Sequence, residues 1–351
     1  MRRLLLLLPL VFAPALLGED ADKDAKLIVK PDAFQTLVNP QCSHCRDEAK
    51  RRAGELRDDD RVLCWTRGYS DGGAIPVRFF LSPFRVISDS YGVFVYDADA
   101  GYARGYAPSY NFRFHGWRNG VMVMKHKDGT LYSCLTGLAF DGPKKGTRLK
   151  AIPTLISNWG FWLEHYPQAV AYHMFDKYKP VELPTEINEE SRKSRPPADK
   201  RLPADAPVLG VWTGKHARAY PAEAVEKAVL LEDKLNDKTS YVLWQGKAGT
   251  AAAYLPEASA PRKYEGPRPN ADGESPPDDR PEGPKKAVTL TFDAKNAAAP
   301  FVDKETGSRW DIAGRAVEGE LKGWTLTWLD STQVKWFAWA AECPETTIYG
   351  K

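Results

Sequence analysis

The sequence carries almost no excess of charge of either sign. Its 49 lysine and arginine residues nearly balance 46 aspartate and glutamate residues, so the formal net charge at pH 7 is +3. A nucleic-acid-binding domain normally has a clear basic excess, and attraction to an anionic membrane surface also needs clustered positive charge. The composition therefore gives no reason to expect nucleic acid or an anionic membrane as a partner.

Long hydrophobic runs are missing after the first 18 residues. The chain begins with the basic residues Arg2 and Arg3, continues with an apolar run from Leu4 to Phe12, and then reaches small residues near Gly18. This order is typical of a secretory signal peptide, because the apolar run is too short to span a bilayer. We expect residues 1–18 to be removed, which leaves an extracytoplasmic protein (periplasmic or secreted) with no membrane span.

The sequence also lacks the short motifs of common catalytic sites. It has no glycine-rich phosphate loop, no His-Glu-x-x-His and no Gly-x-Ser-x-Gly. Cysteine is scarce, and the odd count of five means that at least one thiol is free or pairs between chains. This lack of a catalytic constellation favours a non-catalytic envelope or binding protein.

An internal repeat is the main feature that the sequence does contain. Segments 137–172 and 314–349 align without a gap, and several glycines, tryptophans and a proline recur in the same register. The matched pairs include Gly142 with Gly319, Trp159 with Trp336, Trp162 with Trp339, and Pro167 with Pro344. Such self-similarity is typical of a duplicated unit. We expect two homologous repeats that pack as a pseudo-symmetric pair.

Composition sets the boundaries of these units. We expect an N-terminal arm at 19–60, a first repeat at 61–173 and a second repeat at 207–350. The charged, proline-rich stretch at 174–206 is predicted to be a linker. Residues 256–286 are rich in proline, glycine and acidic residues, and such a composition cannot bury a core. This stretch is predicted to be a disordered insert in the second repeat.

The expected fold class is α+β, with two β-rich repeats, short helices and a short helical N-terminal arm. The high aromatic content favours β-rich cores, and Asn119-Gly120 predicts a tight hairpin turn. Helices are predicted at 77–87 and 222–229. Two more are predicted around the tryptophan pairs, which recur at helical spacing and so indicate core positions rather than a ligand platform.

At these residues the chain resembles the bacterial and archaeal family called domain of unknown function 3179. The resemblance covers 61–349 apart from the linker and the insert. It rests on the stretches 217–221 and 306–310, on Gly314 and Gly319, and on Trp336 to Trp339 followed by Pro344. It implies an uncharacterised exported protein and supplies no catalytic residue. Family members commonly have a Cys-Pro-Leu-Cys-Gly stretch where this chain reads 91–97 without cysteine.

Cys42 and Cys45 form a Cys-x-x-Cys pair just before a helix-favouring run. Asn39 precedes a proline and therefore avoids helical angles, so we expect a helix that begins near Cys42 and continues through Arg52. A thiol at a helix N-terminus has a lowered pKa. One interpretation of this arrangement is a thiol–disulfide oxidoreductase.

Two other interpretations of these cysteines remain open. Cys42, His44 and Cys45, completed by Cys64 or another histidine, would offer soft sulfur and nitrogen ligands that suit zinc or copper. Alternatively, a structural disulfide joins Cys42 to Cys45, or one of them to Cys64, in an oxidising compartment. The sequence thus favours an envelope or binding protein and keeps a metal-binding module and an oxidoreductase as alternatives.

Overall fold

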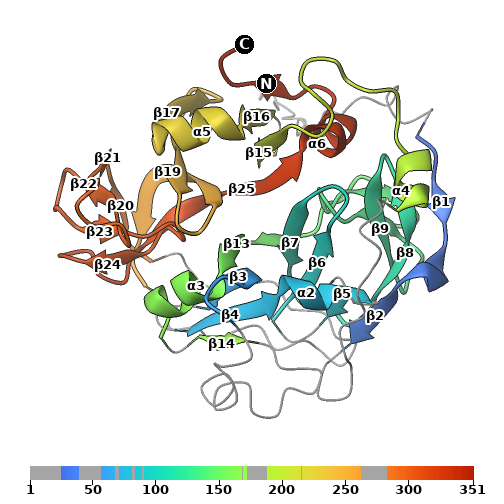
Figure 1. Cartoon of the computed structure of the whole chain (residues 1–351), viewed down its shortest axis with the longest axis horizontal. Helices are drawn as coiled ribbons and strands as arrows, with labels where there is room; N and C mark the ends of the chain where they lie inside the picture. Colours follow the sequence, from blue (N-terminus) through green and yellow to red (C-terminus); the bar gives the residue numbers. More distant parts are fainter. Residues whose placement is uncertain are drawn as a thin grey trace, which may run out of the picture.

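The computed structural model describes residues 25–38, 57–67, 71–80, 84–88, 91–167, 169–171, 188–214, 216–261 and 283–351. Of these residues 48% are in strands, which form several sheets, and 12% are in helices, so this part of the protein is β-rich (Figure 1). The expected α+β class is therefore wrong. Among these residues the longest helices have seven residues, and helices this short depend on packing against the sheets.

Two five-stranded sheets are built mainly from residues 25–152. One runs in the order β1-β8-β9-β10-β11, and the other in the order β12-β7-β6-β5-β2. The strands of the first are β1 (Ile28–Val29), β8 (Phe112–Arg118), β9 (Val121–His126), β10 (Leu131–Ser133) and β11 (Ala139–Asp141). Those of the second are β12 (Ala151–Ile152), β7 (Tyr102–Tyr106), β6 (Val93–Asp97), β5 (Phe84–Ser88) and β2 (Gln35–Val38).

A four-stranded sheet follows the order β13-β3-β4-β14 and carries a short helix. Its strands are β13 (Thr154–Asn158), β3 (Arg61–Arg67), β4 (Asp71–Pro76) and β14 (Val170–Ala171). The helix α3 (Trp159–His165) follows β13 directly, and α2 (Val77–Phe80) follows β4. The helix predicted at 77–87 is thus much shorter, because Val86 and Ile87 pair with β6 in strand β5.

The C-terminal part of the chain forms one large and one small sheet. The large sheet has the order β17-β18-β19-β25-β15-β16-β26, with β20 paired to β19, and the small one has the order β21-β22-β23-β24. The large sheet contains β15 (Pro207–Trp212), β16 (Ala217–Pro221), β17 (Leu230–Leu235), β18 (Lys238–Gln245), β19 (Thr250–Ser259), β20 (Lys285–Ala287), β25 (Thr325–Lys335) and β26 (Thr347–Ile348). The small one contains β21 (Leu290–Phe292), β22 (Phe301–Asp303), β23 (Arg309–Trp310) and β24 (Ala316–Glu318).

Three helices accompany this part of the chain. They are α4 (Glu189–Lys193), α5 (Ala222–Ala228) and α6 (Trp336–Glu342). The helix predicted at 222–229 is confirmed by α5. Part of the predicted linker is packed: Ser191 Oγ donates to the carbonyl of Gly120, and the Gly120 amide donates to Ser194 Oγ. The predicted insert begins in β19 and ends in β20, and its residues 262–282 lie outside the described ones.

The described part of the N-terminal arm is extended rather than helical. Strand β1 pairs with β8, and β2 pairs with β5, with only the 3-10 turn η1 (Pro31–Ala33) between them. The expected helical arm is therefore wrong for residues 25–38, where β-branched side chains and the open edges of two sheets favour strand. The helix predicted from Cys42 through Arg52 lies outside the described residues.

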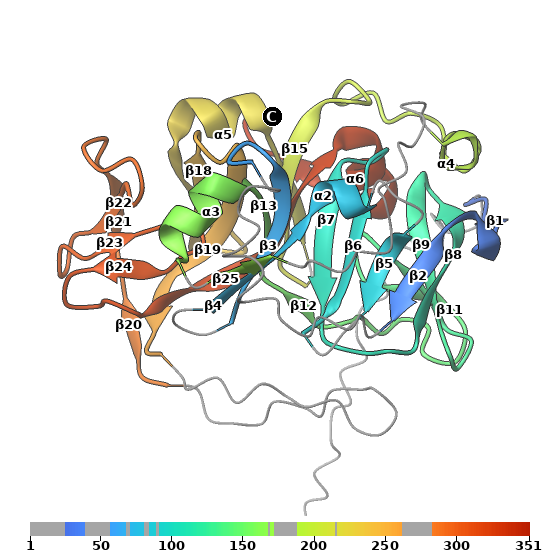
Figure 2. The ribbon, with the colours of Figure 1, turned by 60° about the horizontal axis from the view of Figure 1, so that its bottom comes forward.

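The expected pseudo-symmetric pair of repeats is not found either. The strands next to α3 form a four-stranded sheet of the order β13-β3-β4-β14. Those next to α6 run in the comparable order β25-β15-β16-β26, but they continue into an eight-stranded sheet. Helix α6 packs in a core with Trp117 and Met122 of the N-terminal sheets, and α3 packs in a core with Tyr254 and Trp310. The cores therefore form between early and late segments of the chain, as the crossing of β25 toward α6 shows (Figures 1 and 2).

Two local predictions are confirmed. Trp159, Trp162, Trp336 and Trp339 are each at most 3% exposed, so all four are core residues. Asn119 and Gly120 join β8 to β9 with positive φ angles of 60° and 75°, which is the backbone of a two-residue hairpin turn.

The described residues contain no helix with the length and hydropathy that a bilayer crossing requires.

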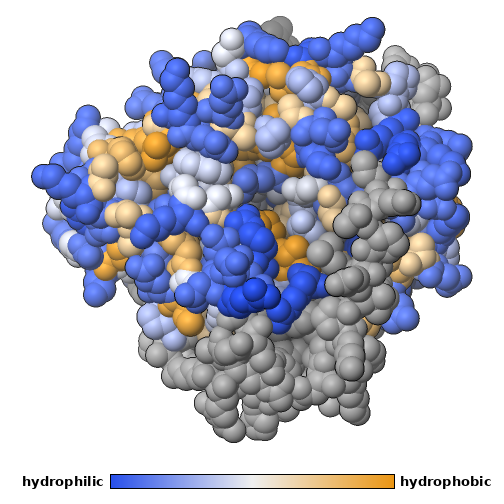
Figure 3. All heavy atoms as spheres, viewed as in Figure 1, coloured by the Kyte–Doolittle hydropathy of each residue, from blue (hydrophilic) through white to orange (hydrophobic). Residues whose placement is uncertain are grey.

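The outer surface is mixed. In the view of Figure 3, hydrophilic side chains cover most of the rim, and hydrophobic ones gather toward the upper middle. The described residues include only two large hydrophobic side chains that are strongly exposed, Val29 and Phe292. Isolated apolar residues of this kind are normal on a protein surface and do not by themselves mark a binding site.

Candidate functional site

Cys64 is the one predicted site residue that the structure places. It lies in β3 with no exposed surface, and its Sγ donates to the carbonyl of Val62 at 3.7 Å. Burial raises the pKa of this thiol well above its ordinary value, against a smaller opposing effect of Arg61. A neutral thiol in an apolar core is neither a metal ligand nor a nucleophile, so Cys64 could serve a metal only by leaving the core.

The other predicted site residues, Cys42, His44 and Cys45, lie outside the described residues. The Cys-x-x-Cys site and its zinc or copper therefore stay a prediction. Within the parts of the chain that the structure places, no group of three or more His, Cys, Asp or Glu side chains could hold a metal ion.

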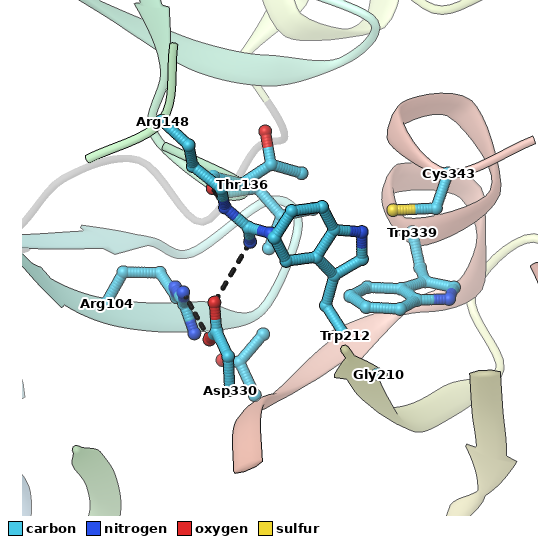
Figure 4. Close-up of a pocket in the computed structure, with 10 residues that line it drawn as sticks. Arg104, Thr136, Arg148, Gly210, Trp212, Asp330, Trp339 and Cys343 are labelled. Atoms are coloured by element: carbon cyan, nitrogen blue, oxygen red, sulfur yellow. Dashed lines mark hydrogen bonds and ion pairs between the residues drawn. The ribbon is translucent and has the colours of Figure 1, made fainter. Parts of the chain in front are cut away.

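A small pocket between early and late segments of the chain gathers charged and aromatic side chains. We call it the Asp330 pocket, and its main lining residues are Arg104, Thr136, Arg148, Trp212, Asp330 and Cys343. Arg104 comes from β7, Asp330 from β25 and Trp212 from β15, while Cys343 directly follows α6. Figure 4 shows both arginines reaching toward the carboxylate of Asp330, with the ring of Trp212 against Arg148.

One carboxylate holds two guanidinium groups. Arg104 Nη2 donates to Asp330 Oδ1 at 2.6 Å, and Arg148 Nη2 donates to Asp330 Oδ2 at 3.0 Å. Arg148 Nε also donates to the carbonyl oxygen of Thr136 at 2.5 Å. Charge-assisted bonds of this length are strong, so the three side chains form one rigid unit.

Strand pairing explains why the ring of Trp212 lies beside the carboxylate of Asp330. Trp212 and Asp330 are direct partners across β15 and β25, and such partners point to the same face of a sheet. The guanidinium carbon of Arg148 lies 3.2 Å from the ring centroid of Trp212, which is a cation–π contact. Arg148 therefore binds a carboxylate and a ring that the sheet places side by side.

Both arginines keep their charge. Burial lowers the pKa of Arg148 to about 10, with Asp330 opposing this effect. Burial also acts to lower the pKa of Arg104, but Asp330 and Tyr106 outweigh it and hold that pKa above its ordinary value. Two positive charges thus face one carboxylate, and the side chain of Arg104 is only 2% exposed.

The pocket has one spare donor and little space. Arg104 Nε is buried and has no hydrogen-bond partner among the described residues, which is a costly state for a charged group. The cavity measures about 10 Å³, roughly the room of one water molecule. The side chains of Arg148 and Asp330 are 16% and 19% exposed, so solvent reaches the site.

Reasoning from the sequence missed this pocket entirely. Arg104, Arg148, Trp212 and Asp330 lie in four separate segments and belong to no motif with characteristic spacing. Arginine and aspartate are common surface residues, so neither type marks a site by itself. The pairing of β15 with β25 and the approach of β7 and of the segment that carries Arg148 bring them together.

Comparison with known proteins places the chain in a family. No curated protein and no solved structure matches it. The family model described as protein of unknown function (DUF3179) matches residues 117–346. This match is narrower than the resemblance predicted over 61–349, and of the main pocket residues it leaves out only Arg104. Because it spans more than half of the sequence, the chain belongs to the family of proteins of unknown function DUF3179.

Proposed function

We propose that the protein is an exported, extracytoplasmic binding protein without catalytic activity, and that the Asp330 pocket holds its ligand. The observation that supports this is the meeting of two guanidinium groups and one carboxylate beside a cavity that solvent reaches. One arginine paired with Asp330 would suffice to join two segments of the chain. The second arginine adds a positive charge and hydrogen-bond donors that this structural role does not require.

The chemistry of the pocket suits binding better than catalysis. Guanidinium groups hold their protons at neutral pH and act as donors and fixed charges rather than as acids or bases. The thiol of Cys343 lines the pocket, but burial, together with Glu342, raises its pKa to about 12. A protonated thiol is a poor nucleophile. The pocket therefore offers charge, hydrogen bonds and aromatic walls.

The extracytoplasmic location rests on the signal peptide predicted at residues 1–18. Its test is expression of the full chain in a bacterial host, followed by fractionation and mass spectrometry of the intact protein. We expect protein that lacks the first 18 residues, or a few more or fewer, in the periplasm or medium. Cytoplasmic protein that still contains the apolar run would refute this part of the proposal.

The binding role is tested by a ligand screen on the purified mature protein. Small charged and uncharged metabolites are added, and the melting temperature is measured for the wild type and for Arg148→Met, which removes the charge but keeps the bulk. Arg309→Met is the control, because Arg309 forms an ion pair with Asp293 in the small sheet, outside the pocket. We expect at least one ligand to raise the melting temperature of the wild type and the control only. A shift that persists in Arg148→Met would place the binding site elsewhere.

A further inference from the structure

We infer that the ligand presents a single carboxylate to Arg104 and Arg148 of the Asp330 pocket. The inference rests on the proposed binding function and adds the chemical class of the ligand. It follows from three properties of the pocket, namely its charge, its size and its unused hydrogen-bond donor.

The charge of the pocket matches one negative charge. Among the described residues, Asp330 is the one carboxylate that pairs with Arg104 and Arg148. Glu342 lies nearby and contacts the hydroxyl of Thr136 at 3.4 Å, but Arg118 is close to its carboxylate, with 3.9 Å between Nη1 and Oε1. One positive charge thus stays unbalanced. A monoanion neutralises it, whereas a dianion would leave an unpaired negative charge beside a buried group, which is unfavourable.

The size of the cavity favours a planar group over a tetrahedral one. A space of about 10 Å³ admits roughly one water-sized atom, so one carboxylate oxygen can enter while the rest of the group stays at the mouth. Carboxylates match the planar fork of a guanidinium. A phosphate or sulfate with one oxygen in the cavity would place three more oxygens at the mouth, whereas a carboxylate places one oxygen and its carbon skeleton there beside the aromatic lining.

The unused hydrogen-bond donor and the aromatic lining of the pocket also suit a carboxylate ligand. Arg104 lines the cavity, and its buried Nε has no acceptor within the described part of the chain, so an entering carboxylate oxygen would satisfy it. Trp212 and Trp339 also line the cavity. Trp339 is buried, whereas Trp212 is only half-buried, and its exposed part gives the carbon skeleton of an organic acid an apolar surface.

The test is isothermal titration calorimetry of the mature full-length protein in a low-salt buffer. Acetate is the probe, and chloride, sulfate and inorganic phosphate are titrated at the same concentrations. We expect saturable acetate binding to the wild type and at least about tenfold weaker binding of the other anions. Arg148→Met should abolish acetate binding. Arg148→Lys, which keeps the charge but loses the fork, should weaken it by about tenfold.

Arg309→Met is the matched control, and its acetate affinity should equal that of the wild type. Should Arg148→Met fail to fold, Arg148→Lys carries the test. Chloride or sulfate that binds as tightly as acetate and depends on Arg148 would overturn the carboxylate class but leave the binding function standing. Acetate binding that is unchanged in Arg148→Met would also overturn the inference. If neither an anion nor any ligand of the screen depends on Arg148, the proposed function itself fails.

A second titration separates two sources of a carboxylate. A short peptide with uncharged side chains and a free C-terminus is compared with the same peptide amidated at its C-terminus. Tighter binding of the free peptide than of acetate, with no binding of the amide, identifies a peptide C-terminus. Binding of acetate but of neither peptide identifies a small free acid, and both results support the inference. Equal binding of the free and amidated peptides would contradict it.

Discussion

Two short helices, α3 and α6, occupy comparable local positions, but the polar clusters beside them differ in charge balance and in the exposure of the carboxylate. Each has seven residues, follows a strand directly, and carries tryptophan at its first and fourth positions. In each case the second tryptophan lies close to a glycine of a neighbouring strand. A Cβ at Gly72 would lie 3.0 Å from the ring of Trp162, and one at Gly210 would lie 2.2 Å from the ring of Trp339.

The cluster beside α3 is balanced in charge, and its carboxylate is closed to solvent. Asp311 is 1% exposed, accepts a hydrogen bond from Tyr166 Oη at 3.3 Å, and lies 3.7 Å from Arg315 Nε. The guanidinium of Arg315 stacks on the ring of Tyr166 at 4.2 Å. One carboxylate meets one guanidinium here, and burial raises the pKa of Asp311, although Arg315 opposes this effect.

The Asp330 pocket beside α6 has two arginines for one carboxylate, and solvent reaches it. A buried Arg–Asp pair is therefore not by itself a sign of function, because such pairs also occur as parts of the scaffold. Charge in excess of what the scaffold needs, combined with access, is what distinguishes a candidate binding site.

The largest expected effect is the loss of the carboxylate that the two arginines share. Asp330→Ala leaves Arg104 buried without its partner, so we expect the free energy of unfolding to fall by about 3–5 kcal/mol. Urea unfolding measures it. The control is Glu320→Ala, which breaks the exposed pair with Lys286 and should cost less than about 1 kcal/mol. Similar losses in the two variants would show that Asp330 does not hold the pocket together.

A smaller difference in stability is expected between variants of Trp162 and Trp339, the tryptophans at the fourth position of α3 and α6. Trp339 Nε1 donates to Thr346 Oγ1 at 2.9 Å, whereas the buried Nε1 of Trp162 has no partner among the described residues. Replacement by phenylalanine leaves a similar cavity at each site but removes a made hydrogen bond only at Trp339. Trp339→Phe should therefore destabilise the protein by about 1–3 kcal/mol more than Trp162→Phe in thermal or urea unfolding. The reverse order would contradict this difference between the two helices.

The raised pKa of the buried Asp311 carboxyl group should appear in the pH dependence of stability. A folded-state pKa above the ordinary value of 3.8 for Asp311 means that the folded state binds the proton more tightly than the unfolded state. The stabilisation from this group is complete below about pH 3.8 and is lost as pH rises through the folded-state pKa. The free energy of unfolding of the wild type, minus that of Asp311→Asn, should fall as pH rises from 4. A flat or rising difference would refute the raised pKa.

The smallest expected effect is that of Cys64 on bound metal. Because Cys64 is buried in the core, Cys64→Ala should cost about 1 kcal/mol of stability and leave the metal content of the purified protein unchanged. Zinc and copper are measured by mass spectrometry in the wild type and the variant. A loss of metal on this substitution would restore Cys64 as a ligand, together with the set of Cys42, His44 and Cys45.

Local patterns predicted several elements of this fold and failed where neighbouring strands compete. The turn at Asn119-Gly120 and helix α5 were predictable because their signals lie within a few residues. The helix predicted at 77–87 ends at Phe80, since β5 gains partners on both sides from β2 and β6. The N-terminal residues 25–38 are likewise strand because open sheet edges accept them.

By itself the sequence determined the β-rich character of the cores, the burial of the four helix tryptophans and the family to which the chain belongs. These properties follow from composition and from patterns within single segments. Only the tertiary structure decided that Cys64 lies in a core and that Arg104 and Arg148 meet Asp330. The physical reason is that a charged side chain gains its role from its partners, and these partners come from segments more than a hundred residues apart in the chain.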